Sequence, residues 1–255
     1  MTSPDEPAGS SGLVRLGVAG SRFEAWRGRP SGGPWVPAMV LFGDGLARAV
    51  EEVADRRGAA VPVAGALLFE GYAQRIVPPV IGGWIVDGGV PACGLADVAV
   101  EWAGGRTVRI ACADGPDSGP DRLLDANLVP ALEAVHAATG VGRRVLRGAV
   151  AHAVCVAFLH LSWPKPDPAD DVIRLREVLE RFGLDSLVHH EALLVGDRPW
   201  LYAERRSCCL AFRAADHRGA TVPFCATCPV VPEADRRRSF EAAVAAFVQR
   251  TVPPS

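Results

Sequence analysis

Lysine, methionine and tyrosine are scarce in this sequence of 255 residues: Lys165 is its one lysine, and methionine and tyrosine occur twice each. Arginine therefore carries almost all of the positive charge, and the formal net charge is −2. Proteins that bind nucleic acid neutralise phosphates with a concentrated excess of positive charge. The nearly equal numbers of basic and acidic residues in this sequence predict no nucleic-acid partner.

A secretion signal and a long uninterrupted apolar run are also missing. Residues 1–12 have neither the positive nor the apolar region of a signal peptide, so we expect a disordered tail there. The apolar stretch 59–86 contains Glu70 and Arg75, and the stretch 148–164 is short for a span of about 20 residues. We therefore expect a cytoplasmic protein without stable membrane insertion.

Nucleotide-binding loops are absent as well. No glycine cluster has the spacing of a phosphate-binding loop or its place between a strand and a helix. The sequence therefore predicts that any redox enzyme built on this chain takes its electrons from another protein or a small reductant.

What the sequence does have is enough apolar residues, 49%, to bury a sizeable core. Apolar spacing and helix-ending residues predict helices, and alternating runs around glycine-containing turns predict hairpins. Pro78-Pro79 should stop or kink the second helix. The predicted helices cover 44–57, 63–76, 125–139, 148–163, 170–182 and 236–250, and the predicted hairpins pair 97–102 with 107–112 and 192–195 with 200–203.

This pattern predicts an α+β fold, with several helices around antiparallel strands and hairpins and a small cysteine-rich knuckle near the C-terminus. We divide the chain into the tail 1–12, an α+β body over 13–200, and a C-terminal segment over 201–255 that carries the knuckle and a closing helix.

Seven cysteines in a cytoplasmic protein should be reduced, as thiols or as metal ligands. Cys93, Cys112 and Cys155 are scattered among apolar neighbours, so we expect ordinary buried thiols there. The other four form the pattern C-C-x15-C-x2-C and are discussed together.

Cys208-Cys209 and Cys225-x-x-Cys228 make up that pattern. A CxxC turn aims two sulfurs at one centre, and thiolates suit zinc or the iron of an iron–sulfur cluster. Adjacent residues of a regular strand point to opposite faces, so Cys208 and Cys209 converge only from a turn or a bulge. The clustering favours a metal site over four unconnected thiols, and the spacing leaves zinc and iron–sulfur both open.

The run RRSCCL over 205–210, followed by CxxCP over 225–229, resembles the C-terminal motif of ferric siderophore reductases. The resemblance implies a [2Fe–2S] cluster ligated by Cys208, Cys209, Cys225 and Cys228. The family's gap between the pairs is near ten residues and here it is fifteen, so we expect the stretch around 214–220 to bulge outward as a longer loop.

Before residue 205 the resemblance to this family rests on fewer matching residues. Leu146-Arg147-Gly148-Ala149 stands where the family often has a Trp-Gly-Asn-like element, and the glycine is the match. The predicted order of helices before the cysteines is similar to the family's N-terminal part, which is related to siderophore synthetases.

The resemblance implies an oxidoreductase that reduces siderophore-bound Fe(III) by one electron, with no catalytic residues beyond the cluster ligands. Hard oxygen donors hold Fe(III) far more tightly than Fe(II), so one electron releases the metal. The expected substrate is a ferric siderophore, first of the hydroxamate type, and the expected electron donor is a ferredoxin or a flavoprotein. Arg205, Arg206 and Arg147 are candidate substrate-binding residues, and Arg205 and Arg206 would also favour the reduced cluster.

Two alternatives remain open. The four cysteines would hold a structural zinc in a binding module that is not an enzyme, or the cluster would sense iron or oxygen in a siderophore-binding protein. Among the histidines, His217 lies between the cysteine pairs and is a candidate replacement ligand, whereas His189-His190 reads as a solvated loop.

Overall fold

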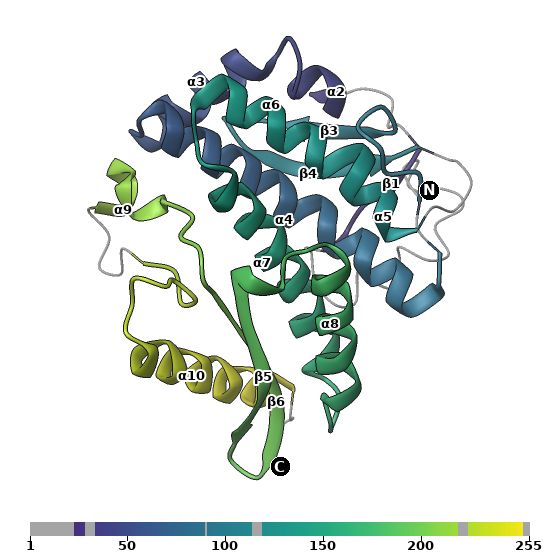
Figure 1. The fold of residues 1–255 in the computed structure, drawn as a ribbon, viewed down its shortest axis with the longest axis vertical. Helices are drawn as coiled ribbons and strands as arrows, with labels where there is room; N and C mark the ends of the chain where they lie inside the picture. The colour runs from purple at the N-terminus through teal and green to yellow at the C-terminus, as the bar shows by residue number, and fades with distance from the viewer. Residues whose placement is uncertain (1–22, 29–33, 90, 114–118, 219–223, 252–255) are drawn as a thin grey trace, which may run out of the picture.

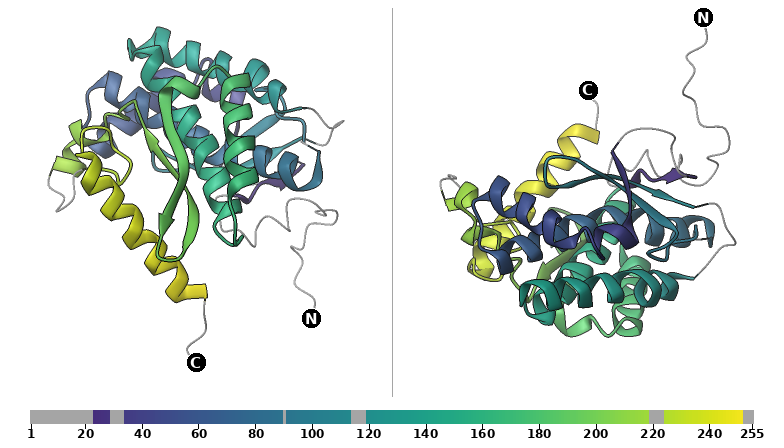
Figure 2. Two further views of the ribbon diagram at one scale, coloured as in Figure 1. Left: turned by 60° about the horizontal axis from the view of Figure 1, so that its bottom comes forward. Right: turned by 90° about the horizontal axis from the view of Figure 1, so that it is seen from above.

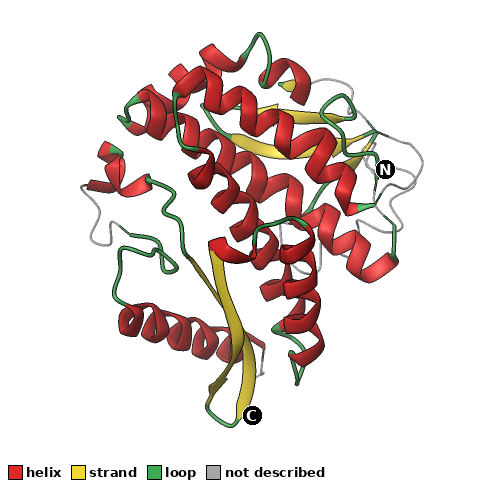
Figure 3. Cartoon of the chain, viewed as in Figure 1, coloured by secondary structure: helices red, strands yellow, loops and turns green. Residues whose placement is uncertain are grey.

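A computed structural model describes residues 23–28, 34–89, 91–113, 119–218 and 224–251 (Figure 1). The predicted tail over 1–12 lies outside these residues. Helices predominate and strands form two separate sheets (Figure 3), so the predicted α+β class is confirmed. The proposed division into body and C-terminal segment stays a prediction.

The strands are β1 (Trp26–Arg27), β2 (Trp35–Pro37), β3 (Val98–Trp102), β4 (Thr107–Cys112), β5 (Val188–Val195) and β6 (Arg198–Arg205). The helices are α2 (Ala38–Leu41), α3 (Leu46–Arg57), α4 (Val61–Asp87), α5 (Pro120–Leu123), the π-helical turn η2 (Leu124–Leu128), α6 (Val129–Thr139), α7 (Arg143–Ser162), α8 (Ala169–Arg181), the 3-10 turns η3 (Asp185–Leu187) and η4 (Ala211–Arg213), α9 (Ala215–Arg218) and α10 (Glu233–Thr251).

The larger sheet has the order β1-β4-β3-β2. Strands β3 and β4 pair antiparallel, as the hairpin pattern predicted. Strand β2 also pairs antiparallel with β3, whereas the two-residue β1 pairs in parallel with β4. Helix α4 packs against β4 and also against α3, α6 and α7. It is therefore the central helix of the fold.

Helix α4 corrects the prediction made from Pro78-Pro79. It does not stop there but continues to Asp87. The side chains of Val77, Val80 and Ile81 around the prolines are fully buried. Burial of each such side chain contributes about 1.5–3 kcal/mol, which offsets the cost of the two missing backbone donors.

Helix α7 lies along α4 and most of its residues are buried. By length and composition α7 alone, within the described part of the chain, is long and apolar enough to cross a membrane, and 67% of that apolar window is buried inside the protein. It is accordingly a core helix.

The second sheet is the hairpin β5–β6, longer at both ends than predicted. Helix α10 lies along it (Figure 2, left). Arg236 near the start of α10 contacts Glu204, and Phe247 near its end contacts Trp200, so α10 runs antiparallel to β6. The elements α7, β6 and α10 thus share two common ends, one near the cysteines and one near the hairpin turn.

Candidate metal centre

The adjacent cysteines lie in irregular backbone just after β6, as their convergence requires. Leu210 closes this turn with a φ of 66°, a left-handed conformation that no other non-glycine residue adopts within the described ranges. Its backbone N–H donates to the Sγ of Cys208 at 3.3 Å. The backbone is therefore folded back around the first cysteine of the pair.

The second pair lies in a tight turn. The N–H of Cys228 donates to the carbonyl oxygen of Cys225 at 2.9 Å, and the N–H of Val231 donates to the carbonyl oxygen of Cys228 at 3.0 Å. Cys228 is buried, and Cys225 is half-buried. Helix α10 begins at Glu233, directly after this turn.

The two turns bring thiols of both pairs into contact. Cys209 Sγ accepts hydrogen bonds from the thiols of Cys208 and Cys225, which hold the pKa of Cys209 well below its usual range. The same bonds, together with burial, raise the pKa values of Cys208 and Cys225. Cys228 is close enough to interact electrostatically with Cys208 and Cys225, so all four cysteines lie near one another.

A buried arginine lies beside these cysteines. Arg205 is 2% exposed, and its Nη1 donates to Glu70 Oε1 on α4 at 2.6 Å. Burial lowers the pKa of Arg205, but the nearby Glu70 and Cys209 outweigh it and raise that pKa. Its Nε and Nη2, and the Oγ of neighbouring Ser207, are buried without hydrogen-bond partners within the described structure. Such orphaned donors are rare in proteins and call for an acceptor.

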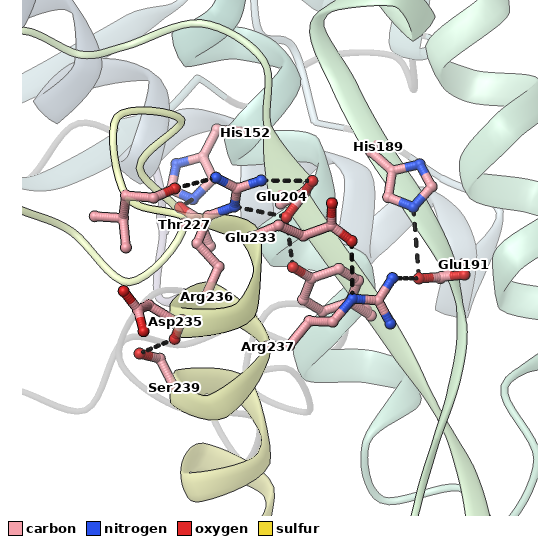
Figure 4. A network of polar contacts seen from close by, with 12 residues as sticks. His152, His189, Glu191, Glu204, Thr227, Glu233, Asp235, Arg236, Arg237 and Ser239 are labelled. Carbon is pink, nitrogen blue, oxygen red and sulfur yellow. Dashed lines mark hydrogen bonds and ion pairs between the residues drawn. The ribbon is translucent and has the colours of Figure 1, made fainter.

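Polar side chains of the core tie the CxxC turn to the helices. His152 on α7 shares one hydrogen bond with Gln74 Nε2 at 3.0 Å. It shares another with Thr227 Oγ1 at 3.4 Å (Figure 4). The same histidine lies 3.8 Å from Glu70. Burial, against the opposing effect of Arg205, raises the pKa of Glu70.

Close packing between α7 and the turn before Cys208 requires a glycine at position 148. A Cβ at this position of α7 would lie 1.6 Å from Ser207 Oγ and 2.7 Å from Ser207 Cβ. Only a residue without a side chain lets the turn before Cys208 approach α7 this closely.

The loop between the cysteine pairs differs from its predicted outward bulge. Its described part forms η4 and α9 and contacts the end of α3: the N–H of Ala215 donates to the carbonyl oxygen of Gly58 at 3.1 Å, and Arg57 pairs with Asp216 at 2.5 Å. His217 lies on α9, and its side chain falls outside what the structure describes. The loop is long because it reaches another element.

The other two candidate arginines are not brought to the cysteines. Arg206 follows the last residue of β6 and is exposed near His190, whereas Arg205 is buried. Arg147 Nη2 donates to the carbonyl oxygen of Gly183 at 2.6 Å, where it caps the end of α8. Their substrate-binding role stays a prediction.

The three scattered cysteines are buried, as predicted. Burial raises the pKa of the Cys155 thiol to about 12, which keeps it protonated and unreactive. Glu70 and Gln74 were not predicted to belong to the site, and His152, on a predicted helix, was expected to be a packed or hydrogen-bonded side chain. A carboxylate within an apolar helix was the one signal that pointed to Glu70, because a buried charge needs a partner.

No protein-family model matches the sequence, and no curated protein matches it. Among solved structures, the ATP-bound aerobactin synthetase IucA from a hypervirulent pathotype of Klebsiella pneumoniae has a TM-score of 0.44 at 16% identity, over 49% of this chain and 29% of that enzyme. The chain thus spans less than a third of that enzyme's length. A likeness this distant does not by itself support any function, although the neighbour is an enzyme of siderophore biosynthesis.

Proposed function

We propose that this protein is a ferric siderophore reductase whose cysteines hold a [2Fe–2S] cluster. The observation that carries the proposal is the contact between thiols of the two pairs, Cys209 with Cys208 and with Cys225, beside the buried charge of Arg205. The motif over 205–210 and 225–229 supplies the family resemblance.

The donor set fits such a cluster better than a single zinc ion. Within the described residues, no group of three or more His, Cys, Asp or Glu side chains is gathered in a way that would hold one metal ion. A binuclear cluster takes two thiolates on each iron, so its ligands need not surround one point. The unpartnered Nε and Nη2 of Arg205 and Oγ of Ser207 are donors, which suit the sulfur acceptors of an anionic cluster.

When bound, the cluster would supply one-electron transfer. The four cysteines would hold it, and Arg205, fixed by Glu70, would offset its negative charge and favour the reduced state. Cys208 and Cys225 are half-buried and Cys209 and Cys228 are buried, so a ferric chelate would approach from the side of Cys208 and Cys225. One electron from an external donor protein would convert the bound Fe(III) to Fe(II), which leaves its oxygen ligands.

Anaerobic purification tests the cofactor. We expect a brown protein whose visible absorption bleaches on reduction while a half-spin EPR signal appears. Cys208→Ser, Cys209→Ser, Cys225→Ser and Cys228→Ser should each lose or severely destabilise this spectrum, and the matched variants of Cys93, Cys112 and Cys155 should keep it. A colourless protein with one stoichiometric zinc would refute the proposal.

Turnover needs a separate measurement. Mixing reduced protein with a ferric hydroxamate siderophore in a stopped-flow instrument should reoxidise it at a rate that depends on the chelate. Slow reoxidation at one rate for all chelates would refute the reductase and favour a sensor of iron or oxygen.

A further inference from the structure

A pocket of about 1000 Å³ lies at the end of α7, β6 and α10 opposite to the cysteines. The C-terminal half of α7 forms one wall, the β5–β6 turn a second, and the last turns of α10 a third. Along α7, His160 in the pocket wall is eight residues, or about 12 Å, beyond His152 at the cysteine end. The cysteine site therefore does not account for this pocket.

Three aromatic rings line one side of the pocket. Trp163, Trp200 and Phe247 pack edge to face, with ring centres 5.5–6.0 Å apart. Apolar walls of this kind, in a volume at the upper end of the range for small-molecule sites, suit a ligand with an aromatic or aliphatic body.

The charges of the lining favour an anion. Arg198 stacks on Trp200, with its guanidinium carbon 3.5 Å from the ring centre, and Arg250 lies at the end of α10. Asp197 in the hairpin turn is the acidic residue of the lining, and it opposes two arginines. The lining thus has an excess of positive charge on an otherwise apolar surface.

Two donors in this wall have no acceptor. Arg198 Nη2 donates to the carbonyl oxygen of Trp163 at 2.8 Å, but Arg198 Nε and Trp200 Nε1 are buried without partners within the described residues. Buried donors are almost always paired in folded proteins. A carboxylate only accepts hydrogen bonds, so in this pocket it would bond the accessible part of the half-buried Arg198 side chain.

We propose that this pocket binds an amphipathic organic acid. Its apolar body lies against Trp163, Trp200 and Phe247, and its carboxylate meets Arg198. The proposal goes beyond the reductase function, since it involves neither the cysteines nor electron transfer.

Calorimetric titration of the full-length protein with octanoate tests the proposal, and octan-1-ol serves as the uncharged control. We expect octanoate to bind at least tenfold more tightly, because a charge-assisted hydrogen bond replaces a neutral one. Arg198→Gln should remove that preference and Arg198→Lys should keep part of it. No binding of octanoate at millimolar concentration, or equal binding of octan-1-ol, would overturn the proposal.

A second pair of variants blocks the pocket without removing a contact. Ala245 is an exposed residue of the pocket wall, and Ala243 is exposed on the opposite face of α10, two residues away. Ala245→Trp should abolish octanoate binding, whereas Ala243→Trp should leave it unchanged. Binding that survives Ala245→Trp would place the ligand elsewhere and overturn the proposal, whatever the state of the cysteine site.

Discussion

Helices α7 and α10 have nearly the same length, 20 and 19 residues, but they are held in opposite ways. Most of α7 is buried against α4 and the rest of the core. In α10, Val244 is the one buried apolar side chain of the described residues, and the helix is attached through ion pairs and aromatic edges. Stability of α7 is thus spread over a large area, whereas that of α10 and the cysteine turns depends on a few named contacts.

The ion pair between Glu70 on α4 and Arg205 at the end of β6, next to the cysteine turns, should give the largest effect. Glu70→Ala leaves the buried charge of Arg205 without its partner, so we expect a loss of about 3–5 kcal/mol in the free energy of unfolding, measured by urea denaturation. The exposed pair Arg143–Glu133 provides the control, and Glu133→Ala should cause little change. Equal effects of the two variants would show that the pair does not anchor the segment.

Two glycine variants sharpen the comparison next. Gly148→Ala forces Ser207 away from α7, so we expect a loss of about 1–3 kcal/mol in the free energy of unfolding. Gly71→Ala, in the interior of α4 with open space around its Cβ, should instead gain up to about 1 kcal/mol. Thermal melts followed by circular dichroism measure both, and Ser207→Gly should rescue Gly148→Ala. A stabilising Gly148→Ala would contradict the close approach.

Arg236 and Arg238 of α10 allow a comparison between a contact that anchors the helix and an ion pair on its surface. Arg236 is mostly buried and bonds Glu204 and the carbonyl oxygen of Val231, whereas Arg238 is exposed and pairs within its own helix (Figure 4 shows this region). Arg236→Ala should cost about 2 kcal/mol and expose α10 to subtilisin, because it removes charged hydrogen bonds. Arg238→Ala should leave the digestion pattern unchanged. Faster cleavage in both variants would mean that the net positive charge of α10, and not the specific contacts of Arg236, holds the helix in place.

The smallest effect is a pH dependence on the hairpin. Burial, and then the charge of Arg176, lower the pKa of His190. The folded state therefore binds fewer protons than the unfolded state, and stability is lost as the pH falls below about 6.5 and through the folded pKa. His190→Gln should flatten this part of the stability–pH curve, and Arg176→Gln should flatten it partly. An unchanged curve in His190→Gln would assign the slope to other groups.

Local sequence patterns predicted those helices and hairpins that are determined by residues close to one another in the sequence. The helices over 44–57, 170–182 and 236–250 and both hairpins follow from periodicity and turn residues, and the structure confirms them. The run through Pro78-Pro79 could not be predicted, because burial by distant elements decides it. A π-helical turn at Leu124–Leu128 also has no local signal.

The candidate site divides in the same way. The cysteine spacing predicted one site for the four cysteines, and their role as ligands stays a prediction, whereas the separation of buried Arg205 from exposed Arg206 comes from where β6 ends. Glu70 could not be assigned a role from the sequence, because its partner Arg205 lies 135 positions away. Contacts at that separation are set by the fold as a whole and leave no periodic trace.

The contact between Ala215 and Gly58 has a consequence for assembling the cysteine pairs. Bringing the pairs together closes a loop of fifteen residues, and the closure entropy grows only with the logarithm of its length. Relative to a loop of about ten residues, the extra cost is about 0.4 kcal/mol. The hydrogen bond between Ala215 and Gly58 attaches α9 to the end of α3, so two shorter loops close in place of one longer loop. The five additional residues therefore cost little free energy, and the second pair of cysteines follows a segment that is already attached to the fold.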